Sequence, residues 1–178
     1  MNKMLNYLDI ETTGFDFRND KIITIQYQEL DSLGKQKGDL IILKEWESDE
    51  KTIVTKIWNK LIKENTWSFI PLGTNLVFDL TFLFEKFKKY NLSAPTLSDW
   101  IFEHPLIDIK SSLIIANNLQ FKGSGLDKMT NKESNGKNIP IYYHDKLYGE
   151  IEAYIKQEAS SFLEFFDELR NVLIKLKK

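Results

Sequence analysis

The chain has 178 residues, of which 42% are hydrophobic and 28% are charged, a composition typical of one globular domain. It contains no cysteine, which excludes disulfides, thiolate nucleophiles and cysteine-ligated metal centres. The net charge is −2, from 24 basic and 26 acidic residues, and this balance argues against binding of duplex nucleic acid through a broad basic face.

Targeting and membrane segments are not evident in the sequence. No apolar run approaches the ~20 residues that a membrane-spanning helix needs. The N-terminal segment has one lysine and no long apolar stretch that ends in small residues, so we expect no secretory signal and a cytoplasmic location.

The first third of the sequence predicts three strands. Residues 4–10 are short and mostly apolar, residues 21–30 are rich in β-branched and aromatic side chains, and residues 39–44 repeat that composition. The turn-rich connection over residues 31–38 predicts that the second and third strands form a hairpin.

The middle of the chain alternates between helices and strands. A helix is expected from the N-terminal signal Ser48-Asp49-Glu50 to about Ile62. Residues 68–73 predict a fourth strand, and its Pro71 suits a sheet edge or a strand start. Residues 79–90 predict a helix, residues 106–109 a fifth strand, and residues 111–118 a further helix.

The last third predicts a loop and a long helical segment. Residues 121–140 are dominated by Gly, Asn and Lys, with one short helical turn expected near Leu126. The apolar stripe of residues 147–176 predicts one long helix or two adjoining ones. The complete order predicts a single α/β domain over residues 1–178, with a mixed five-stranded sheet that begins with a β-hairpin and is flanked by helices.

Two carboxylates stand at the end of the first predicted strand, in Asp9-Ile10-Glu11-Thr12-Thr13-Gly14. Asp9 and Glu11 are two positions apart, so their side chains point to the same face of the strand. Adjacent negative charges are costly unless a cation offsets them or one takes up a proton. Such oxygen ligands suit Mg²⁺ or Mn²⁺, although a solvated acidic turn is an alternative interpretation.

This motif closely resembles the opening motif of the DEDD 3′–5′ exonucleases, which have a ribonuclease H-like fold. The segment Asn75-Leu76-Val77-Phe78-Asp79 resembles their second motif, in which an asparagine precedes Phe-Asp and an apolar helix. Asp79 could instead be an ordinary helix N-cap.

The third motif of the family separates a histidine branch from a tyrosine branch. Neither His104 nor His144 is followed five residues later by an aspartate. Tyr154 precedes Glu158 by four residues, as in the tyrosine branch, but glutamate replaces the usual aspartate. Residues four apart share a helix face, and residues 148–166 resemble the corresponding helix of family B polymerase proofreading domains. The alternative is a surface Glu158 and a core Tyr154.

The resemblance implies two-metal hydrolysis at the 3′ end of single-stranded nucleic acid, with DNA favoured over RNA and two Mg²⁺ or Mn²⁺ ions as cofactors. It implies that Tyr154 orients the attacking water. The residues that it implies as metal ligands are Asp9, Glu11, Asp79 and Glu158. Those that it implies for substrate contact are Thr12, Thr13, Gly14, Phe15 and Asn75.

Several other residues have simpler interpretations. For Asp108 a turn or capping role is favoured over a role in the site. Among the aromatic residues, Phe15 and Phe17 are the best candidates for substrate contact, whereas Phe82 and Trp100 are expected in the core. The lysines within residues 86–89 and 122–137 are expected to form a solvated face.

Alternative functions and assemblies stay open at the sequence level. The chain could be a non-catalytic DEDD-like binding module or a polymerase accessory subunit with a degenerate site. It could also be a ribonuclease H-like nuclease that cuts internally. The hairpin edge and the apolar terminal helix could support a homo-oligomer.

Overall fold

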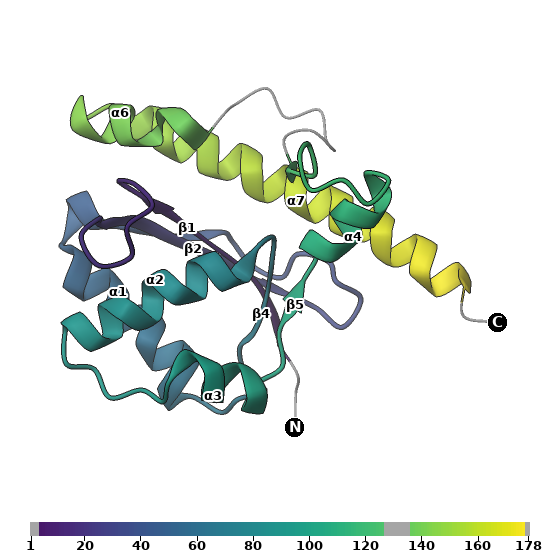
Figure 1. Ribbon diagram of the computed structural model, residues 1–178, viewed down its shortest axis with the longest axis horizontal. Coiled ribbons are helices and arrows are strands. Elements are labelled where there is room, and N and C mark those ends of the chain that lie inside the picture. Colours follow the sequence, from purple (N-terminus) through teal and green to yellow (C-terminus); the bar gives the residue numbers. More distant parts are fainter. Residues whose placement is uncertain (1–3, 127–135, 177–178) are drawn as a thin grey trace.

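A five-stranded mixed sheet forms the centre of the computed structural model, which describes residues 4–126 and 136–176 (Figure 1). Its strand order is β3-β2-β1-β4-β5. β1 and β2 pair in antiparallel fashion, as do β2 and β3, whereas β4 runs parallel to β1 and to β5. The predicted hairpin and mixed sheet are therefore confirmed. The strands are β1 (Leu5–Thr12), β2 (Ile22–Leu30), β3 (Ile41–Lys44), β4 (Ile70–Gly73) and β5 (Ile107–Asp108).

Helices connect the strands and cover both faces of the sheet. The described helices are the short 3₁₀ turn η1 (Glu45–Glu47), α1 (Glu50–Trp58), its π-helical continuation η2 (Asn59–Lys63), α2 (Leu76–Lys89), α3 (Leu97–Glu103), α4 (Lys110–Ala116), the 3₁₀ turn η3 (Gly136–Asn138), α6 (Ile139–His144) and α7 (Tyr148–Leu176). Among the described residues, no helix is both long enough and apolar enough to cross a membrane.

The sheet separates two layers of helices. α1, α2 and α3 lie on one side, and α4, α6 and α7 lie on the other, where α7 crosses the whole sheet (Figure 1). Alternation along β1 follows this division, because successive side chains of a strand point to opposite faces. Leu8 and Ile10 pack against α1 and α2, whereas Tyr7 packs against α7.

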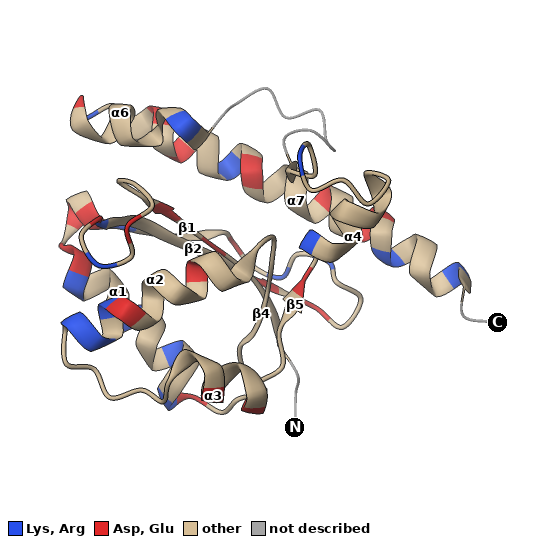
Figure 2. Ribbon diagram, viewed as in Figure 1, with Lys and Arg blue, Asp and Glu red and all other residues tan. Residues whose placement is uncertain are grey.

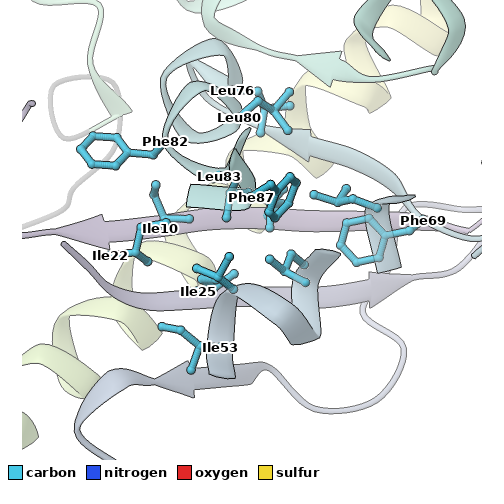
Figure 3. Packing of buried hydrophobic residues seen from close by; sticks show 14 of the residues in the cluster. Ile10, Ile22, Ile25, Ile53, Phe69, Leu76, Leu80, Phe82, Leu83 and Phe87 are labelled. Carbon is cyan, nitrogen blue, oxygen red and sulfur yellow. The ribbon is translucent and has the colours of Figure 1, made fainter. Parts of the chain in front are cut away.

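The larger core lies between the sheet and the α1–α2 layer (Figure 3). Ile10 and Ile25 from the sheet meet Ile53 of α1 and Leu83 of α2, and each of these four is at most 5% exposed. Burial of such a side chain stabilises the fold by about 1.5–3 kcal/mol. This core fixes α2 against β1, and so fixes the distance between the candidate residues on both elements.

Two helices were not predicted from the sequence. α3 is short, and its start is marked by Thr96, whose hydroxyl accepts a hydrogen bond from the Asp99 backbone N–H. α6 begins at the end of the segment predicted as loop over residues 121–140 and continues to His144, through residues for which no element was predicted. The residues just before Ile139 are polar and gave no helical signal. Ile139 itself is buried against β2 and α7, and this packing holds the short helix in place. Helices this short depend on tertiary packing rather than on propensity.

Other expectations differ in detail. β4 lies inside the sheet, so the edge alternative for Pro71 is wrong, and this proline is the second residue of its strand. The segment of residues 147–176 is one continuous helix rather than two. Of the helical turn expected near Leu126, Leu126 itself is helical, and residues 127–135 lie outside the described residues.

Candidate active site

The end of β1 carries Asp9 and Glu11 on the face that α7 covers. Tyr7, two positions earlier on the same face, packs on Phe162 of α7 with 4.9 Å between the ring centroids. The shared face of these alternate residues was expected from the strand spacing. Both carboxylates therefore lie between the sheet and α7, and Figure 2 shows acidic positions on β1 and α7 there.

Asp79 comes from the opposite layer and reaches the backbone of β1. It lies in the first turn of α2 and is 4% exposed, and its Oδ1 accepts a hydrogen bond of 3.1 Å from the Ile10 backbone N–H. The N-cap position of α2 belongs to Asn75. The N-cap interpretation of Asp79 is therefore wrong.

Asp108 serves the start of α2 instead. Its two carboxylate oxygens accept hydrogen bonds of 2.9 Å from the backbone N–H groups of Asn75 and Leu76, and its Oδ1 also accepts one from Lys110. The capping role favoured for Asp108 is therefore confirmed. Since the capped turn contains Asp79, Asp108 at β5 also fixes where α2 begins relative to the sheet.

α7 brings Tyr154 towards the β1 carboxylates. The pKa of Tyr154 is raised by burial, by the negative charges of Glu11 and Glu158, by a hydrogen bond with Glu158, and by the charge of Asp9. These causes place Tyr154 beside three carboxylates from two elements. Its hydroxyl also lies against η3, because a Cβ on Gly136 would be only 2.7 Å from it.

Polar and aromatic contacts hold the start of α7 over the strand ends. Trp46 stacks on Tyr148 with 4.5 Å between the ring centroids and 5° between the planes. Lys44 of β3 forms an ion pair of 2.7 Å with Glu152. Tyr143 of α6 donates a hydrogen bond to Glu45 of η1. These contacts determine where the first turns of α7, and with them Tyr154, meet the sheet.

The four candidate carboxylates share one electrostatic environment, for which Tyr7 is a useful probe. Burial raises the pKa of its hydroxyl well above the ordinary value of 10.0, and the negative charges of Asp9, Glu158, Glu11 and Asp79 raise it further. The interaction of two charges weakens with distance, so these four groups lie in the neighbourhood of Tyr7, whose hydroxyl donates to Asp9 Oδ2 at 3.4 Å. The structure therefore gathers the residues of all three predicted motifs into one region.

The pKa of Asp79 shows the electrostatic penalty of bringing these carboxylates together. Burial raises the pKa of its carboxyl well above the ordinary value of 3.8, and the negative charge of Asp9 adds to the increase. Like charges in a buried region are unfavourable unless a cation or a proton compensates them. Carboxylate oxygens are the ligands that hard divalent cations prefer, so the donor set fits Mg²⁺ or Mn²⁺.

The side chains do not yet form a finished metal site. Over residues 4–126 and 136–176, no group of three or more His, Asp or Glu side chains is arranged so that it could hold a metal ion. The acids share an environment but are not in coordinating positions.

Two polar residues of β2 were missed by the sequence analysis. Gln26 pairs with Asp9 across the β1–β2 ladder, and its Nε2 donates a hydrogen bond of 2.7 Å to Asp9 Oδ2. The Thr24 hydroxyl donates to Gln26 Oε1 at 3.0 Å and so orients the amide. The signal was present, because Thr24, Gln26 and Gln28 alternate with apolar residues and share one strand face.

The end of β1, the loop after it and the start of α2 hold the residues expected to contact substrate. Thr12 donates from its hydroxyl to the Gly14 carbonyl at 2.6 Å, and the Thr13 hydroxyl accepts from the Lys21 backbone N–H at 2.9 Å. Asn75 adopts a left-handed conformation with φ 62° at the start of α2. The hydrogen bonds of Thr12 and Thr13 fix the backbone where it leaves β1, and Asn75 turns the chain into α2.

The four aromatic candidates differ in how far each side chain is exposed to solvent. Phe15 is 84% exposed and makes an edge-to-face contact with Phe78, with 6.1 Å between their centroids. Phe17 packs on Phe82 at 5.0 Å and adjoins the larger core. Phe82 and Trp100 are buried, as predicted. Only Phe15 of this set therefore offers a ring face to solvent.

Comparisons with solved structures identify exonuclease I as similar in fold. One such structure, described as suggesting how processivity is achieved, has a TM-score of 0.58 and 14% identity, over 74% of this chain and 36% of that chain. The zinc-bound E. coli exonuclease I complex with single-stranded DNA gives 0.58 and 14%, over 74% and 35%. An SSB/exonuclease I structure with an inhibitor gives 0.54 and 15%, over 69% and 32%.

The chain spans about a third of the length of these proteins, and at such identities the likeness concerns the fold alone. No curated protein matches the sequence. A family model described as the RNase_H superfamily matches residues 6–158, a range that contains all four candidate carboxylates and the whole sheet except Leu5, the first residue of β1. The chain therefore belongs to the RNase H superfamily.

Proposed function

We propose that this protein is a metal-dependent 3′–5′ exonuclease that hydrolyses the terminal phosphodiester bond of single-stranded nucleic acid, with DNA favoured over RNA. The observation that carries the proposal is the common environment of Asp9, Glu11, Asp79 and Glu158 beside Tyr154. Support for an exonuclease within the RNase H superfamily comes from the DEDD-like motifs. The fold likeness to exonuclease I, which has been solved with single-stranded DNA, is consistent with it.

The residues that would hold divalent ions are the four carboxylates. Two bound ions would acidify the attacking water and neutralise the charge that develops on the leaving oxygen. Gln26 would keep the Asp9 carboxylate in a fixed orientation through its 2.7 Å hydrogen bond. Asp79 would remain tied to β1 through the Ile10 N–H.

Tyr154 would act as a hydrogen-bond donor rather than as a base. Burial and the surrounding negative charges raise its pKa, so the phenol keeps its proton throughout the neutral range. A protonated phenol can orient an attacking water or a phosphate oxygen by donating to it. This role needs no histidine, in agreement with the tyrosine-type third motif.

Substrate contact is assigned to the loop after β1 and to the start of α2. Phe15 offers an exposed ring on which a terminal base can stack, an interaction worth about 1–3 kcal/mol per base and tolerant of sequence. Backbone groups of Thr12, Thr13 and Gly14 would approach the terminal sugar and phosphate. Asn75, which begins α2, would brace the same nucleotide.

The direct test uses 5′-labelled single-stranded DNA and RNA of the same sequence, each incubated with the protein and Mg²⁺ or Mn²⁺. We expect a ladder that shortens from the 3′ end and is absent for Asp9→Ala. A substrate with a blocked 3′ end should resist cleavage, and cleavage of it would indicate an internally cutting nuclease. If the protein binds the nucleic acid but does not cleave it in the presence of either metal, the chain is a non-catalytic binding module instead.

A further inference from the structure

Lys86 of α2 does not belong to the solvated face that the sequence predicted. It is fully buried at 0% exposure, whereas its neighbours Lys88 and Lys89 are exposed. An ammonium group is rarely buried unless it is paired and hydrogen-bonded. The position of Lys86 therefore calls for a reason beyond the packing of its stem.

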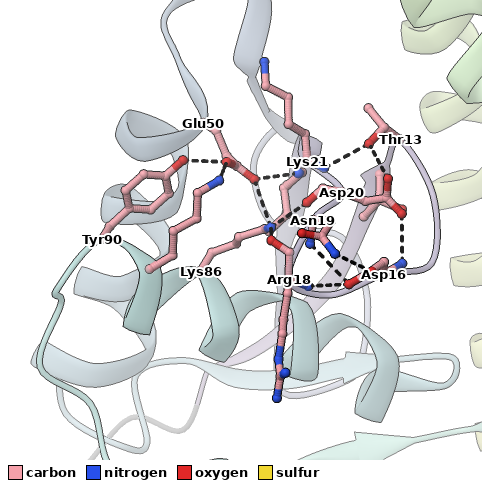
Figure 4. Close-up of polar contacts among 12 residues, drawn as sticks. Thr13, Asp16, Arg18, Asn19, Asp20, Lys21, Glu50, Lys86 and Tyr90 are labelled. Atoms are coloured by element: carbon pink, nitrogen blue, oxygen red, sulfur yellow. Dashed lines mark hydrogen bonds and ion pairs between the residues drawn. The ribbon is translucent and has the colours of Figure 1, made fainter.

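The Lys86 ammonium points into the base of the loop formed by residues 13–20 (Figure 4). It donates hydrogen bonds to the backbone carbonyls of Asp20 and, at 3.3 Å, Arg18. Glu50 lies 3.8 Å away and supplies the opposite charge. Lys86 thus binds the loop through main-chain oxygens, which hold the backbone in place whatever side chains it carries.

Glu50 is anchored independently of Lys86. Its Oε1 accepts from the Ile22 backbone N–H at 2.9 Å, and its Oε2 accepts from Tyr90 and from Lys89. Removal of the Lys86 charge would therefore leave Glu50 with three donors. An uncharged residue of similar length at position 86 should be tolerated by the fold.

Asp20 links the Lys86 ammonium to residues nearer the tip of the loop. Its carbonyl accepts from Lys86, while its carboxylate accepts from the Thr13 hydroxyl at 3.3 Å and from the Asp16 backbone N–H at 2.8 Å. A Cβ on Gly14 would lie 2.3 Å from Asp20 Oδ2, so the carboxylate occupies the space above that glycine. Both ends of the loop are thus fastened to one residue.

Burial cannot position the tip of this loop. Phe15 is 84% exposed, and Phe78 at 6.1 Å is its ring contact. The direction of its ring therefore depends on the loop backbone. A pre-ordered loop binds a ligand more tightly than a mobile one, because the ordering entropy is not lost on binding.

We propose that Lys86 and Asp20 are positioning residues that hold loop 13–20, and with it Gly14 and Phe15, in the conformation that receives the terminal nucleotide. The substrate part of this inference rests on the proposed exonuclease function, whereas the anchoring of the loop does not. Removal of one partner of a buried ion pair is destabilising when it leaves the other charge unpaired, but Glu50 keeps three donors without Lys86. The charge of Lys86 would then serve to keep loop 13–20 ordered.

The test compares Lys86→Met with Lys88→Met, which removes the same charge from an exposed position of the same helix. Amide hydrogen exchange of the metal-free proteins should show about tenfold faster exchange over residues 13–21 in Lys86→Met and unchanged exchange in β1, β4 and α7. With Mn²⁺ and single-stranded DNA, KM should rise about tenfold with little change in kcat. Lys88→Met should match the wild type in both measurements.

Asp20→Asn provides a second variant that leaves α2 intact. It weakens the hold on Thr13 and Asp16, and it should raise loop exchange and KM in the same direction. Unchanged loop exchange in both variants would overturn the inference, as would an increase spread evenly over the sheet. If the wild type cleaves no substrate, the proposed function fails, and the exchange of residues 13–21 still decides whether Lys86 orders the loop.

Discussion

At the residue scale, the Asp79 carboxylate lowers the free energy of unfolding of the metal-free protein. Its carboxyl is buried beside Asp9 without a cation in the metal-free protein, and its pKa is raised for that reason. The Oδ1 contact to the Ile10 N–H needs only an acceptor, which an asparagine also provides. The negative charge at this position is therefore unnecessary for folding.

We expect Asp79→Asn to stabilise the metal-free protein by about 1 kcal/mol, because it removes like-charge repulsion, which corresponds to a Tm increase of about 2–4 °C. The same change should abolish nuclease activity and the gain in Tm on addition of Mn²⁺. Calorimetry in EDTA and in Mn²⁺ measures both effects. A lower Tm in EDTA would show that the charge supports the fold.

Glu158 is the residue at which the chain departs from the DEDD pattern. Its carboxylate has one more methylene and one more torsion than an aspartate, so a bound ion must tolerate a less fixed ligand. Mn²⁺ tolerates this better than Mg²⁺, which demands near-ideal octahedral geometry.

We expect Glu158→Asp to keep activity and to lower the ratio of the Mn²⁺ rate to the Mg²⁺ rate. Glu158→Ala should lose at least about 100-fold in kcat, as expected when an electrostatic contact to the reacting groups is removed. Rates with each metal at saturating substrate provide the comparison. Full activity of Glu158→Ala would exclude the residue from the site.

Packing between η3 and α7 sets the position of Tyr154 at the scale of elements. Gly136 leaves room for the phenol hydroxyl, and a Cβ there would be 2.7 Å from it. Because the aromatic ring is rigid, this contact can be relieved only by a shift of the ring or of η3.

Gly136→Ala should therefore displace the Tyr154 hydroxyl and lower kcat about as much as Tyr154→Phe does, on the order of tenfold to 100-fold. Gly149→Ala is a matched control, since no described atom beyond its chain neighbours and the backbone of its own helix lies within 4 Å of the added Cβ. Single-turnover rates and Tm should be measured for all three variants. Normal activity of Gly136→Ala would show that Tyr154 need not lie against η3.

At the scale of the whole molecule, Glu50 connects α1 to β2 and to the end of α2. Burial alone would raise the pKa of its carboxyl, but hydrogen bonds from Tyr90, the Ile22 N–H and Lys89, with the charge of Lys86, lower it below the ordinary 4.5. The unfolded chain thus takes up this proton at a higher pH than the folded chain does. The stabilisation is present above pH 4.5 and is lost as the pH falls through the lower folded value.

Glu50→Gln should cost about 3 kcal/mol at neutral pH, because Lys86 would be left buried without its opposite charge. The variant should also lose the part of the acid-induced decrease in stability that lies below pH 4.5. Urea unfolding between pH 3 and pH 7 gives both quantities. A variant whose stability decreases on acidification as steeply as that of the wild type would contradict this assignment.

Local patterns in the sequence determined which segments along the chain form the strands and the main helices. They also determined the common face of Asp9 and Glu11 and the place of Asp79 near a helix start. Periodicity and turn chemistry act over a few residues, and these features depend on nothing more distant. The tertiary structure decided which distant residues meet. Burial of Lys86 beneath loop 13–20, the contact of Gln26 with Asp9 and the approach of α7 to β1 follow from sheet register and helix packing. No single segment of the chain encodes such contacts, because each depends on two elements folded against a common core.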